Sequence, residues 1–171
     1  MTLTTPRLTL VPHGMKYFES TQKYSSDVEN CRYMFWLPRD TEEETRAFLR
    51  DCENEWKKLQ PSFYEFAVLL DGIHIGAVSA YLEDDGSAEL GWIVDKHHWG
   101  QGYAFEAASA LLDFCRTLGI RHFVAHCDDR NIASKRIMEK LGMELTLCCG
   151  GRKNRASDEL GTECLYELHL N

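Results

Sequence analysis

The sequence contains no apolar run close to the roughly 20 residues that a membrane-spanning helix requires. Its first residues, MTLTTPRLTLVPHG, do not show the basic and then apolar order of a secretory signal. Excess positive charge is also absent, since 19 lysines and arginines face 27 aspartates and glutamates and the net charge is -8. We therefore expect a cytoplasmic protein that binds neither a membrane nor nucleic acid, because nucleic-acid binding requires a cationic surface.

The sequence also lacks a recognisable disulfide or metal-binding pattern. Its seven cysteines are an odd number, and no two of them have the C-x-x-C spacing. Seven histidines are present, but the nearby pair His122 and His126 is not part of a carboxylate and histidine cluster with metal-ligand spacing. We expect reduced, mostly buried thiols and no metal ion.

The composition is typical of one globular domain. The 171 residues, of which 44% are hydrophobic and 27% charged, suffice for one core. No internal repeat, low-complexity tract or long linker interrupts them. The sequence therefore predicts a single domain over residues 1–171. Its acidic balance is also compatible with a cationic or amine substrate, although solubility alone would explain it.

Hydrophobic periodicity in the first third of the chain predicts one strand followed by helical segments. Residues 7–11, RLTLV, alternate as a strand does, whereas residues 15–60 are charged and helix-like. The stretch TEEE that begins at Thr41 is a capping box, which predicts the start of a helix. The apolar side of this helix is expected to extend to Leu59, and Pro61 is expected to end it.

The rest of the chain alternates between strand and helix patterns. An Asp-Gly pair at 71–72 separates two apolar runs, which indicates a hairpin. The expected strands are 63–70, 73–82, 88–95, 120–127, 143–149 and 163–170, the expected helices are 104–118 and 132–141, and a polar loop is expected at 150–159. This order predicts an α/β (α+β) domain with a mixed sheet and helices on its faces.

A glycine-rich junction, WGQGYA at residues 99–104, connects the 88–95 strand to the following helix. Gly100 and Gly102 have no side chains, so the backbone N–H groups of the junction and of the helix start are open to an anion. The helix N-terminus adds a partial positive charge. The junction therefore predicts a phosphate-binding turn, although a tight strand-to-helix turn without any ligand would explain the glycines equally well.

Two common phosphate-binding motifs do not fit this junction. A dinucleotide fingerprint requires a third glycine where this sequence has Phe105. A Walker loop requires Gly-Lys-Ser/Thr, whereas Tyr103 and Ala104 follow Gly102. Neither NAD nor ATP is therefore the expected ligand.

A second motif, NIASKRIMEKLGM at residues 131–143, lies one strand after the glycine junction. Together the two stretches resemble the GNAT acetyltransferase superfamily, and specifically its RimJ/RimL-like branch. The acetyl-CoA loop of that family reads Q/R-x-x-G-x-G/A, which Gly102 and Ala104 match while Trp99 replaces the usual first residue. The second motif matches the branch pattern N-x-x-S-x-R/K-I/V-x-E-K-L-G-M/F, and TPRLTLVP is similar to the branch's first strand. The resemblance covers nearly the whole chain and is weakest over residues 12–60.

The resemblance implies a fold, a co-substrate and a reaction. The implied sheet is mixed, mostly antiparallel, and splayed after its fourth strand, with acetyl-CoA in the wedge and no metal. The implied reaction is direct acetyl transfer in a ternary complex to a primary amine, either a protein N-terminus or a small molecule. The branch also allows a homodimer. The residues that would bind the cofactor are Ile93, Val94, Trp99, Gly100, Gln101, Gly102, Tyr103, Ala104, Asn131 and Ser134.

Two residues are candidates for the chemistry itself. Glu89, on the strand face opposite Trp92, is the candidate general base and would act through water. Its alternative role is that of a structural carboxylate held by hydrogen bonds. Ser134 is the candidate acid, or hydrogen-bond donor, for the leaving thiolate, and its alternative role is that of an ordinary polar helix residue. Asn131 could cap its helix as well as bind the cofactor.

Several other residues near the motifs have two interpretations each. Four cations, Lys96, Arg130, Lys135 and Arg136, could offset the cofactor phosphates or be solvated surface. Glu106 lies at the start of its helix, where packing or helix electrostatics would explain it. Cysteine catalysis is a rival mechanism, but Cys115 falls on an apolar helix face and no His–Asp partnership can be assigned to Cys127.

The segment between the first two long strands is expected to shape the acceptor pocket. Tyr33, Phe35 and Trp36 could line it, and the acidic run 42–44 could attract a cationic amine. Buried aromatics beside a capped helix would explain the same residues. The alternative function is a catalytically weak acyl-CoA-binding or regulatory module on the same fold, because fold alone does not define activity.

Overall fold

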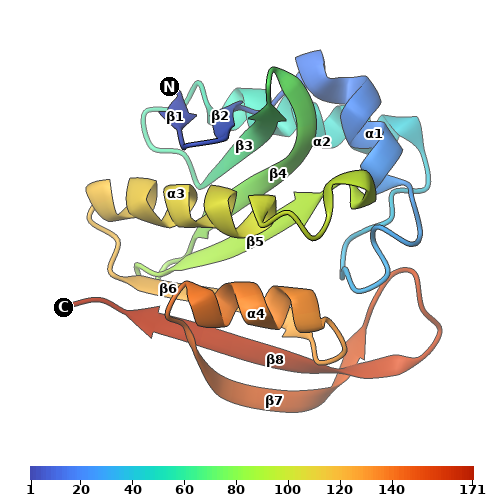
Figure 1. The fold of residues 1–171 in the computed structure, drawn as a ribbon, viewed down its shortest axis with the longest axis vertical. Helices are drawn as coiled ribbons and strands as arrows, with labels where there is room; N and C mark the ends of the chain where they lie inside the picture. The colour runs from blue at the N-terminus through green and yellow to red at the C-terminus, as the bar shows by residue number, and fades with distance from the viewer.

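The computed structural model describes residues 1–171 and contains one eight-stranded sheet with helices on both of its faces (Figure 1). The strands are β1 (Leu3–Thr4), β2 (Leu8–Pro12), β3 (Phe63–Leu70), β4 (Ile73–Leu82), β5 (Ala88–Val94), β6 (His122–Asp128), β7 (Glu144–Lys153) and β8 (Leu160–His169). The helices are α1 (Phe18–Ser25), α2 (Glu42–Glu55), α3 (Tyr103–Thr117) and α4 (Ile132–Lys140), with short 3-10 helices η1 (Met15–Tyr17) and η2 (Lys96–His98). The expected α/β class is confirmed.

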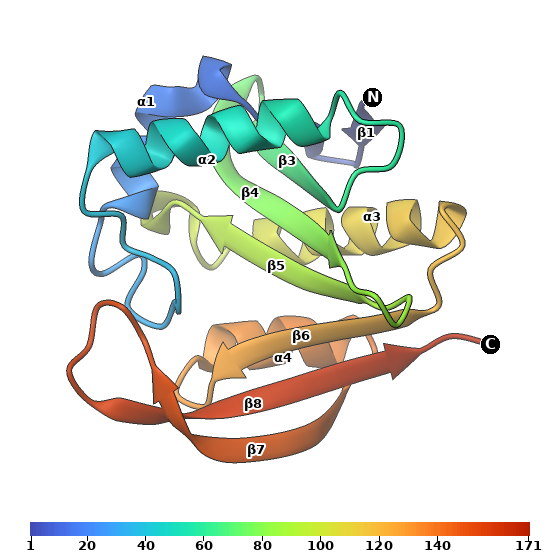
Figure 2. The ribbon, with the colours of Figure 1, turned by 180° about the vertical axis from the view of Figure 1, so that it is seen from behind.

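The sheet has the order β1-β2-β3-β4-β5-β6-β8-β7 and is antiparallel except between β5 and β6. That parallel pairing is limited to Ala88 with Phe123 and Glu89 with Val124. Beyond Glu89 the two strands diverge (Figure 2). The expected splay after the fourth long strand is therefore confirmed, and β5 is that strand because β1 is an additional strand of two residues.

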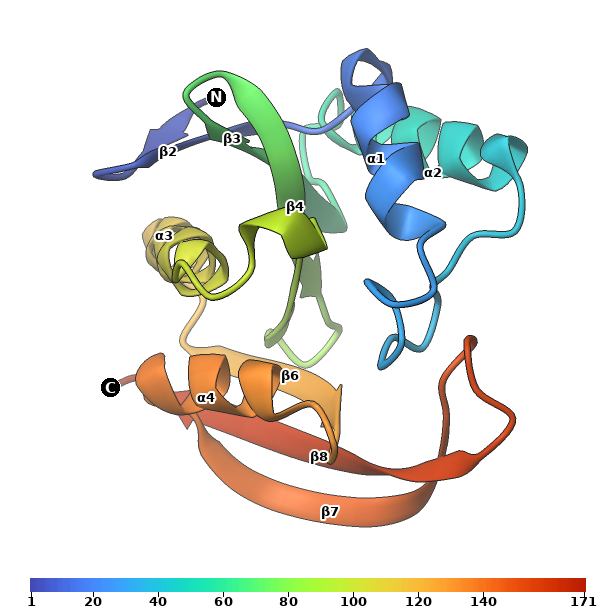
Figure 3. The same cartoon turned by 45° about the vertical axis from the view of Figure 1, so that its right-hand side comes forward.

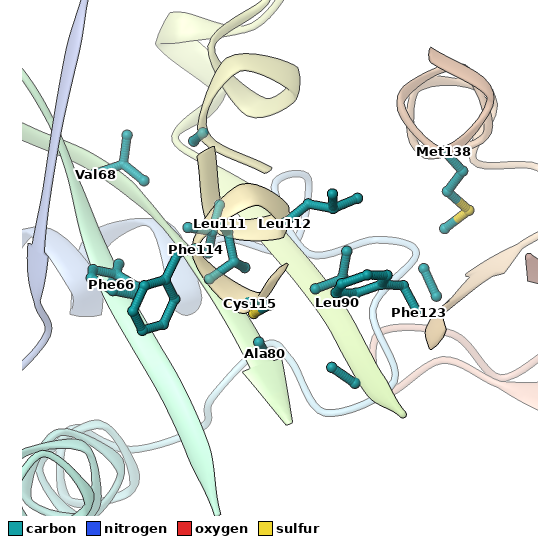
Figure 4. Close-up of a cluster of buried hydrophobic side chains, with 14 of the residues drawn as sticks. Phe66, Val68, Ala80, Leu90, Leu111, Leu112, Phe114, Cys115, Phe123 and Met138 are labelled. Atoms are coloured by element: carbon teal, nitrogen blue, oxygen red, sulfur yellow. The ribbon is translucent and has the colours of Figure 1, made fainter. Parts of the chain in front are cut away.

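The helices form two layers. In Figure 3, α3 lies on one side of β3 and β4, while α1 and α2 lie on the other side; α4 covers β6. The core between α3 and the sheet is apolar, with Leu111 and Cys115 of α3 packed near Phe66 and Leu90 (Figure 4). Each fully buried Leu or Phe contributes about 2 kcal/mol, so burial of this helix face stabilises the sheet directly below the splay.

The strand alternation of β5 decides which face Glu89 occupies. Ala88, Leu90 and Val94 are buried on the α3 side of the sheet, as their spacing predicts. Successive side chains of a strand point to opposite faces, so Glu89 and Ile93 point away from α3. The acid is thereby excluded from the apolar core and directed to the face that α1 and α2 flank.

Three expectations about the loops and ends are wrong. Helix α2 ends at Glu55 instead of reaching Leu59, which is fully exposed. The Glu55 carboxylate accepts hydrogen bonds from the Ser62 backbone and hydroxyl, so the chain turns back toward β3 early. Residues 26–41 are irregular rather than helical. The polar loop of the last hairpin is confined to residues 154–159, because β7 and β8 continue to pair as far as Lys153 and Leu160.

The irregular segment 26–41 meets the 154–159 loop. The Arg155 N–H donates to the Met34 carbonyl at 3.2 Å, and its guanidinium forms ion pairs with Asp40 and Glu44. The two loops lie beside each other at the open end of the splay (Figure 2). No helix of the structure has both the length and the apolar character needed to span a bilayer.

Candidate active site

A groove with a volume of about 1430 Å³ runs through the splay of the sheet. Its walls come from β5, from the glycine turn and the start of α3, from α4, and from the irregular segment 26–41. We call the part of the groove between the glycine turn and α4 the first arm. We call the part lined by residues 26–41, β3, β4 and β8 the second arm. The floor of this second arm is the sheet face that carries Glu89.

The glycine turn has the geometry that an anion requires. Gly100 and Gly102 have φ values of 76° and 81°, which side-chain-bearing residues rarely adopt. Gly102 is the N-cap residue of α3 and makes no side-chain capping bond. The first N–H groups of α3 therefore point into the groove at the positive end of the helix dipole.

Arg7 and Glu106 hold this turn in place. Glu106 accepts hydrogen bonds from the Thr5 hydroxyl at 2.6 Å and from the Arg7 N–H at 2.9 Å. The Arg7 guanidinium is paired with Glu106, donates to the Gln101 carbonyl at 2.9 Å and lies over the Tyr103 ring. Glu106 therefore connects the N-terminal strand to the start of α3, a contact that sequence spacing could not reveal.

The edge of β5 that faces the splay carries unpaired backbone groups. The Asp95 N–H donates to Ile75 across β4 and β5, and hydrogen-bonded pairs alternate along an antiparallel ladder. Ile93 therefore directs its backbone groups to β4, whereas Trp92 and Val94 direct theirs to the gap beside β6. The Val94 carbonyl already accepts a hydrogen bond from the Trp99 indole at 2.8 Å. Trp99 thus anchors the glycine turn to the end of β5.

Helix α4 presents Ser134 to the same gap. Asn131 caps the helix, since its Oδ1 accepts the Ser134 N–H at 3.2 Å. The Ser134 hydroxyl oxygen accepts the Trp92 indole N–H at 3.2 Å, so the O–H of Ser134 is left to donate elsewhere. The cap and the indole together orient the hydroxyl at the groove wall.

Glu89 pairs with a histidine that the sequence did not single out as its partner. The Glu89 Oε1 lies 3.1 Å from the Nδ1 of His126. His126 lies on β6, two residues beyond Val124, the last residue of β6 that pairs with β5. The hydrogen bond with Glu89 raises the pKa of His126. Both side chains line the groove and are about one-third to two-fifths exposed, so water reaches them. Water can therefore bridge this pair to a bound amine.

The floor of the second arm carries another acid. Glu65 of β3 lies opposite Ser79, which in turn lies opposite Gly91 of β5. Burial raises the pKa of Glu65 to about 8, so this carboxyl is mostly protonated at neutral pH. A Cβ at Gly91 would lie 2.6 Å from the Ser79 hydroxyl oxygen, so the floor is closely packed at this point.

Most of the cations expected to meet the cofactor phosphates are already neutralised. Lys96 pairs with Asp27 and Glu29, and Arg130 pairs with Asp128. Lys135 pairs with Asp129. Among the four, Arg136 alone lacks an ion pair, and it lines the groove. The net positive field at this site therefore comes mainly from the backbone of the turn, from Arg136 and from Lys140, which also lines the groove without an ion pair.

Neither the cysteines nor the groups that could bind a metal replace Glu89 as the candidate catalytic residue. Burial raises the pKa of Cys115 to about 12 and that of Cys127 to about 11, so neither thiol is nucleophilic at neutral pH. Two groups of side chains place possible metal-ligating atoms within 4.8 Å of one another: His122, Glu167 and His169, and Asp129, Cys148 and Cys164. The absence of a metal from the reaction stays a prediction.

The structure brings nearly all the predicted site residues to one groove. Its lining includes Glu89, Ile93, Val94, Trp99, Gly100, Gly102, Tyr103, Ala104, Asn131 and Ser134. Gln101 does not line it and instead uses its carbonyl to hold Arg7. Sequence reasoning missed His126, Glu65 and Arg39, which come from other strands or an irregular segment, and no local pattern marks them. The backbone of Trp92 could have been found by extending the two-residue alternation from Val94.

The comparison with known proteins agrees with this geometry. Residues 7–144 match the model of the acetyltransferase (GNAT) domain. The N-acetyltransferase YnaD of Bacillus subtilis (strain 168) is 30% identical over 149 residues, which cover 84% of this chain and 82% of YnaD. A GNAT-family acetyltransferase from Bacillus anthracis has a crystal structure with a TM-score of 0.81 and 27% identity, covering 99% of this chain and 98% of that chain.

The fold extends to more distant structures. RimL, a ribosomal L7/L12 alpha-N-protein acetyltransferase solved with coenzyme A, has a TM-score of 0.85 at 18% identity and covers 99% of this chain and 98% of that chain. At this identity the likeness concerns the fold alone. The chain belongs to the GNAT family of acetyl-CoA-dependent N-acetyltransferases, as the sequence motifs predicted.

Proposed function

We propose that this groove binds acetyl-CoA and a primary amine together, and that the acetyl group passes directly from the thioester to the amine. The observation that carries the proposal is the divergence of β5 and β6, which opens the groove between them. Below it, the anion-binding turn, the free edge of β5 and the Ser134 hydroxyl face one channel, and Glu89 opens onto the same space from the other arm.

The cofactor would lie along the first arm. Its pyrophosphate would accept hydrogen bonds from the N–H groups that follow Gly102, supported by the charge of Arg136. The pantetheine amides would pair with the β5 edge at Trp92 and Val94. Because Trp99 occupies the Val94 carbonyl, we expect the Trp92 groups to carry more of this pairing.

The amine nitrogen would attack the thioester carbonyl, forming the C–N bond as the C–S bond breaks. Glu89, coupled to His126, would take the proton that the amine loses, through an intervening water. The Ser134 O–H would donate a hydrogen bond to the departing sulfur. Serine is a weak acid, so this donation stabilises the thiolate without transferring a proton outright.

The acceptor would enter through the second arm. Tyr33, Phe35 and Trp36 line this arm as predicted, but Phe35 and Trp36 are exposed rather than buried. RimL is described as an acetyltransferase of a ribosomal protein N-terminus, and MccE, with 17% identity and the same fold, as a microcin C7 self-immunity acetyltransferase. We propose a primary amine as the acceptor class; a cytoplasmic location and a homodimer also stay predictions.

Two measurements test the proposal. Titration calorimetry with CoA should show binding that Gly102→Val weakens at least about tenfold, because a side chain is strained at this positive φ and the turn must change its backbone conformation. Thiol release from acetyl-CoA should then depend on the presence of an amine drawn from a panel. Binding of CoA without turnover on any amine would favour the alternative, a regulatory acyl-CoA-binding module. The absence of any CoA binding would contradict both functions.

A further inference from the structure

The second arm of the groove contains a partly buried arginine that has no partner in the chain. Arg39 lines the groove, and its guanidinium forms no ion pair and donates no hydrogen bond. It rests against the Phe48 ring, with its central carbon 4.2 Å from the ring centroid. Two other arginines, Arg32 and Arg136, also lack partners, but both are exposed to water. Among the arginines without a partner, Arg39 is therefore the least exposed to solvent.

The groups around Arg39 do not neutralise it. The neighbours that could carry a negative charge are Tyr24, Cys31, Cys52, Glu65 and Tyr81. Burial raises the pKa of each of them, and the value for Glu65 is about 8. Burial also lowers the pKa of Arg39, but arginine keeps its proton at neutral pH. A positive charge is therefore left uncompensated beside the groove floor.

An uncompensated guanidinium at a groove wall is a ready site for an anion. Its planar N–H groups match a carboxylate or phosphate with two parallel hydrogen bonds, and partial burial strengthens them. The aromatic ring of Phe48 restricts the guanidinium, so less conformational entropy is lost on binding. Arg39 and Glu89 line the same groove, so an anion at Arg39 can belong to the molecule whose amine is near Glu89.

We propose that Arg39 binds a carboxylate or phosphate carried by the amine acceptor, so that the substrates are amines with an anionic group. This inference rests on the acetyl-transfer function proposed above. Glu65, beside Arg39, is two strands from Gly91, or about 10 Å, and Glu89 lies two residues further along β5. This separation favours an anionic group several bonds away from the amine.

The test uses matched pairs of acceptors that differ in one charge. The carboxylate pairs are glycine with glycinamide, 4-aminobutyrate with its amide and 6-aminohexanoate with its amide. The phosphate pair is O-phosphoethanolamine with ethanolamine. Thiol release from acetyl-CoA gives kcat/KM for each amine with the wild type, Arg39→Gln and Arg50→Gln. Comparing proteins on the same amine removes differences in the intrinsic reactivity of the amines.

We expect Arg39→Gln to lower kcat/KM about 10- to 100-fold for the best anionic acceptor and to change its uncharged partner less than about threefold. Arg50→Gln removes the same charge from an exposed side chain of α2 that does not line the groove, so it should change neither by more than about threefold. Arg39→Lys should retain part of the preference, because the charge persists without the planar fork. The larger loss in either the carboxylate or the phosphate pairs identifies the anion.

The failures are distinguishable. Equal losses on charged and uncharged amines, or no loss on either, would overturn the anion subsite while leaving acetyl transfer intact. Loss of turnover on every amine with the wild-type protein would overturn the proposed function and the subsite with it. The unfolding transition shows whether Arg39→Gln folds. If it does not fold, the anion subsite is tested by the kcat/KM values of Arg39→Lys and by the wild-type preference for the longer anionic amines over their uncharged partners. A wild type that prefers every uncharged partner contradicts the subsite.

Discussion

The environment of Glu89 on β5 is set by His126 on β6. Its carboxylate is bonded to His126 and reached by water, whereas Glu65 on the same sheet face is buried and mostly protonated. The same side chain can therefore serve as a base at one position and as a neutral group at the other, because desolvation penalises the ionised carboxylate. A base must be ionised to accept a proton, so Glu89 is the better candidate for that step.

Replacement of Glu89 tests its role in catalysis. We expect Glu89→Gln to lower kcat/KM by about 10²–10⁴ because the amine loses its proton acceptor. The acid-side limb that this base contributes to the pH profile should disappear, leaving the limb set by the protonation of the amine. Unchanged kinetics would exclude the assignment, and Glu83→Gln, at an exposed acid of the same groove, serves as the control.

The same variant has a readout that does not depend on activity. Glu89 raises the pKa of His126 through their hydrogen bond, so Glu89→Gln should lower the pKa of His126. NMR titration of the imidazole signals measures this change. A His126 pKa that does not move would show that the two groups are not coupled in solution.

Glu65 provides a stability prediction with a defined pH window. Its folded pKa of about 8 lies above its ordinary value of 4.5, so the folded state keeps a proton that the unfolded state releases. The contribution of Glu65 is favourable below pH 4.5 and is lost as pH rises toward 8. Glu65→Gln should therefore raise the free energy of unfolding by about 1–3 kcal/mol at pH 8, with the gain shrinking toward pH 5.

Chemical denaturation at the two pH values measures this effect. Glu43→Gln, at an exposed acid of α2, should change stability by less than about 0.5 kcal/mol at both. A Glu65→Gln protein whose stability differs from the wild type equally at pH 5 and pH 8 would refute the window.

Among the elements, the contact between β4 and β5 sets the position of the β5 edge that we propose binds the cofactor. Gly76 of β4 pairs with Val94, and a Cβ at Gly76 would lie 2.2 Å from the Ile93 carbonyl oxygen. No side chain can be accommodated there unless β5 moves. The absence of a side chain at Gly76 therefore maintains the β5 edge beside the splay.

Gly76→Ala tests this dependence. We expect it to lower the free energy of unfolding by about 1–3 kcal/mol and to weaken CoA binding, because β5 must shift. Gly150→Ala is the matched control, since a Cβ at that β-strand position meets nothing within 4 Å. Thermal unfolding and calorimetry measure the two effects. Normal CoA affinity in a folded Gly76→Ala protein would show that β5 does not hold the cofactor.

At the scale of the whole molecule, the two halves of the sheet are joined by few contacts. Strands β5 and β6 share two residue pairs, and the groove occupies the space where further pairing would occur. Arg155 adds a second connection at the open end, through Met34, Asp40 and Glu44. This connection places residues 26–41 over the second arm.

Arg155→Ala tests the importance of the connection. These ion pairs are substantially exposed, so we expect less than about 1 kcal/mol of lost stability. The KM of the amine should nevertheless rise several-fold, because residues 26–41 are less restrained, while CoA affinity is unchanged. Arg50→Ala, which removes an exposed ion pair within α2, is the control. Equal changes in amine KM and CoA affinity would contradict a role confined to the acceptor arm.

Elements that depend on interactions between neighbouring residues could be predicted from the order of residues alone. The alternation of residues 88–94, the glycine turn between β5 and α3 and the Asn131 cap are properties of neighbouring residues, and all are present as predicted. The same local patterns identified the family. They failed at Leu59 and at residues 26–41, where hydrogen bonds from Ser62 and Arg155 outweigh helix propensity.

Which residues share the groove depends on how distant segments of the chain pack together. The pairing of Glu89 with His126 and the indole bond from Trp92 to Ser134 join segments far apart in the sequence. The lack of a partner for Arg39 likewise depends on how such segments pack. Hydrogen bonding and desolvation depend on these distances, and sequence spacing does not encode them. The proposed cofactor-binding turn could therefore be predicted from local motifs, whereas the partner of the candidate base and the charge of the proposed acceptor arm could not.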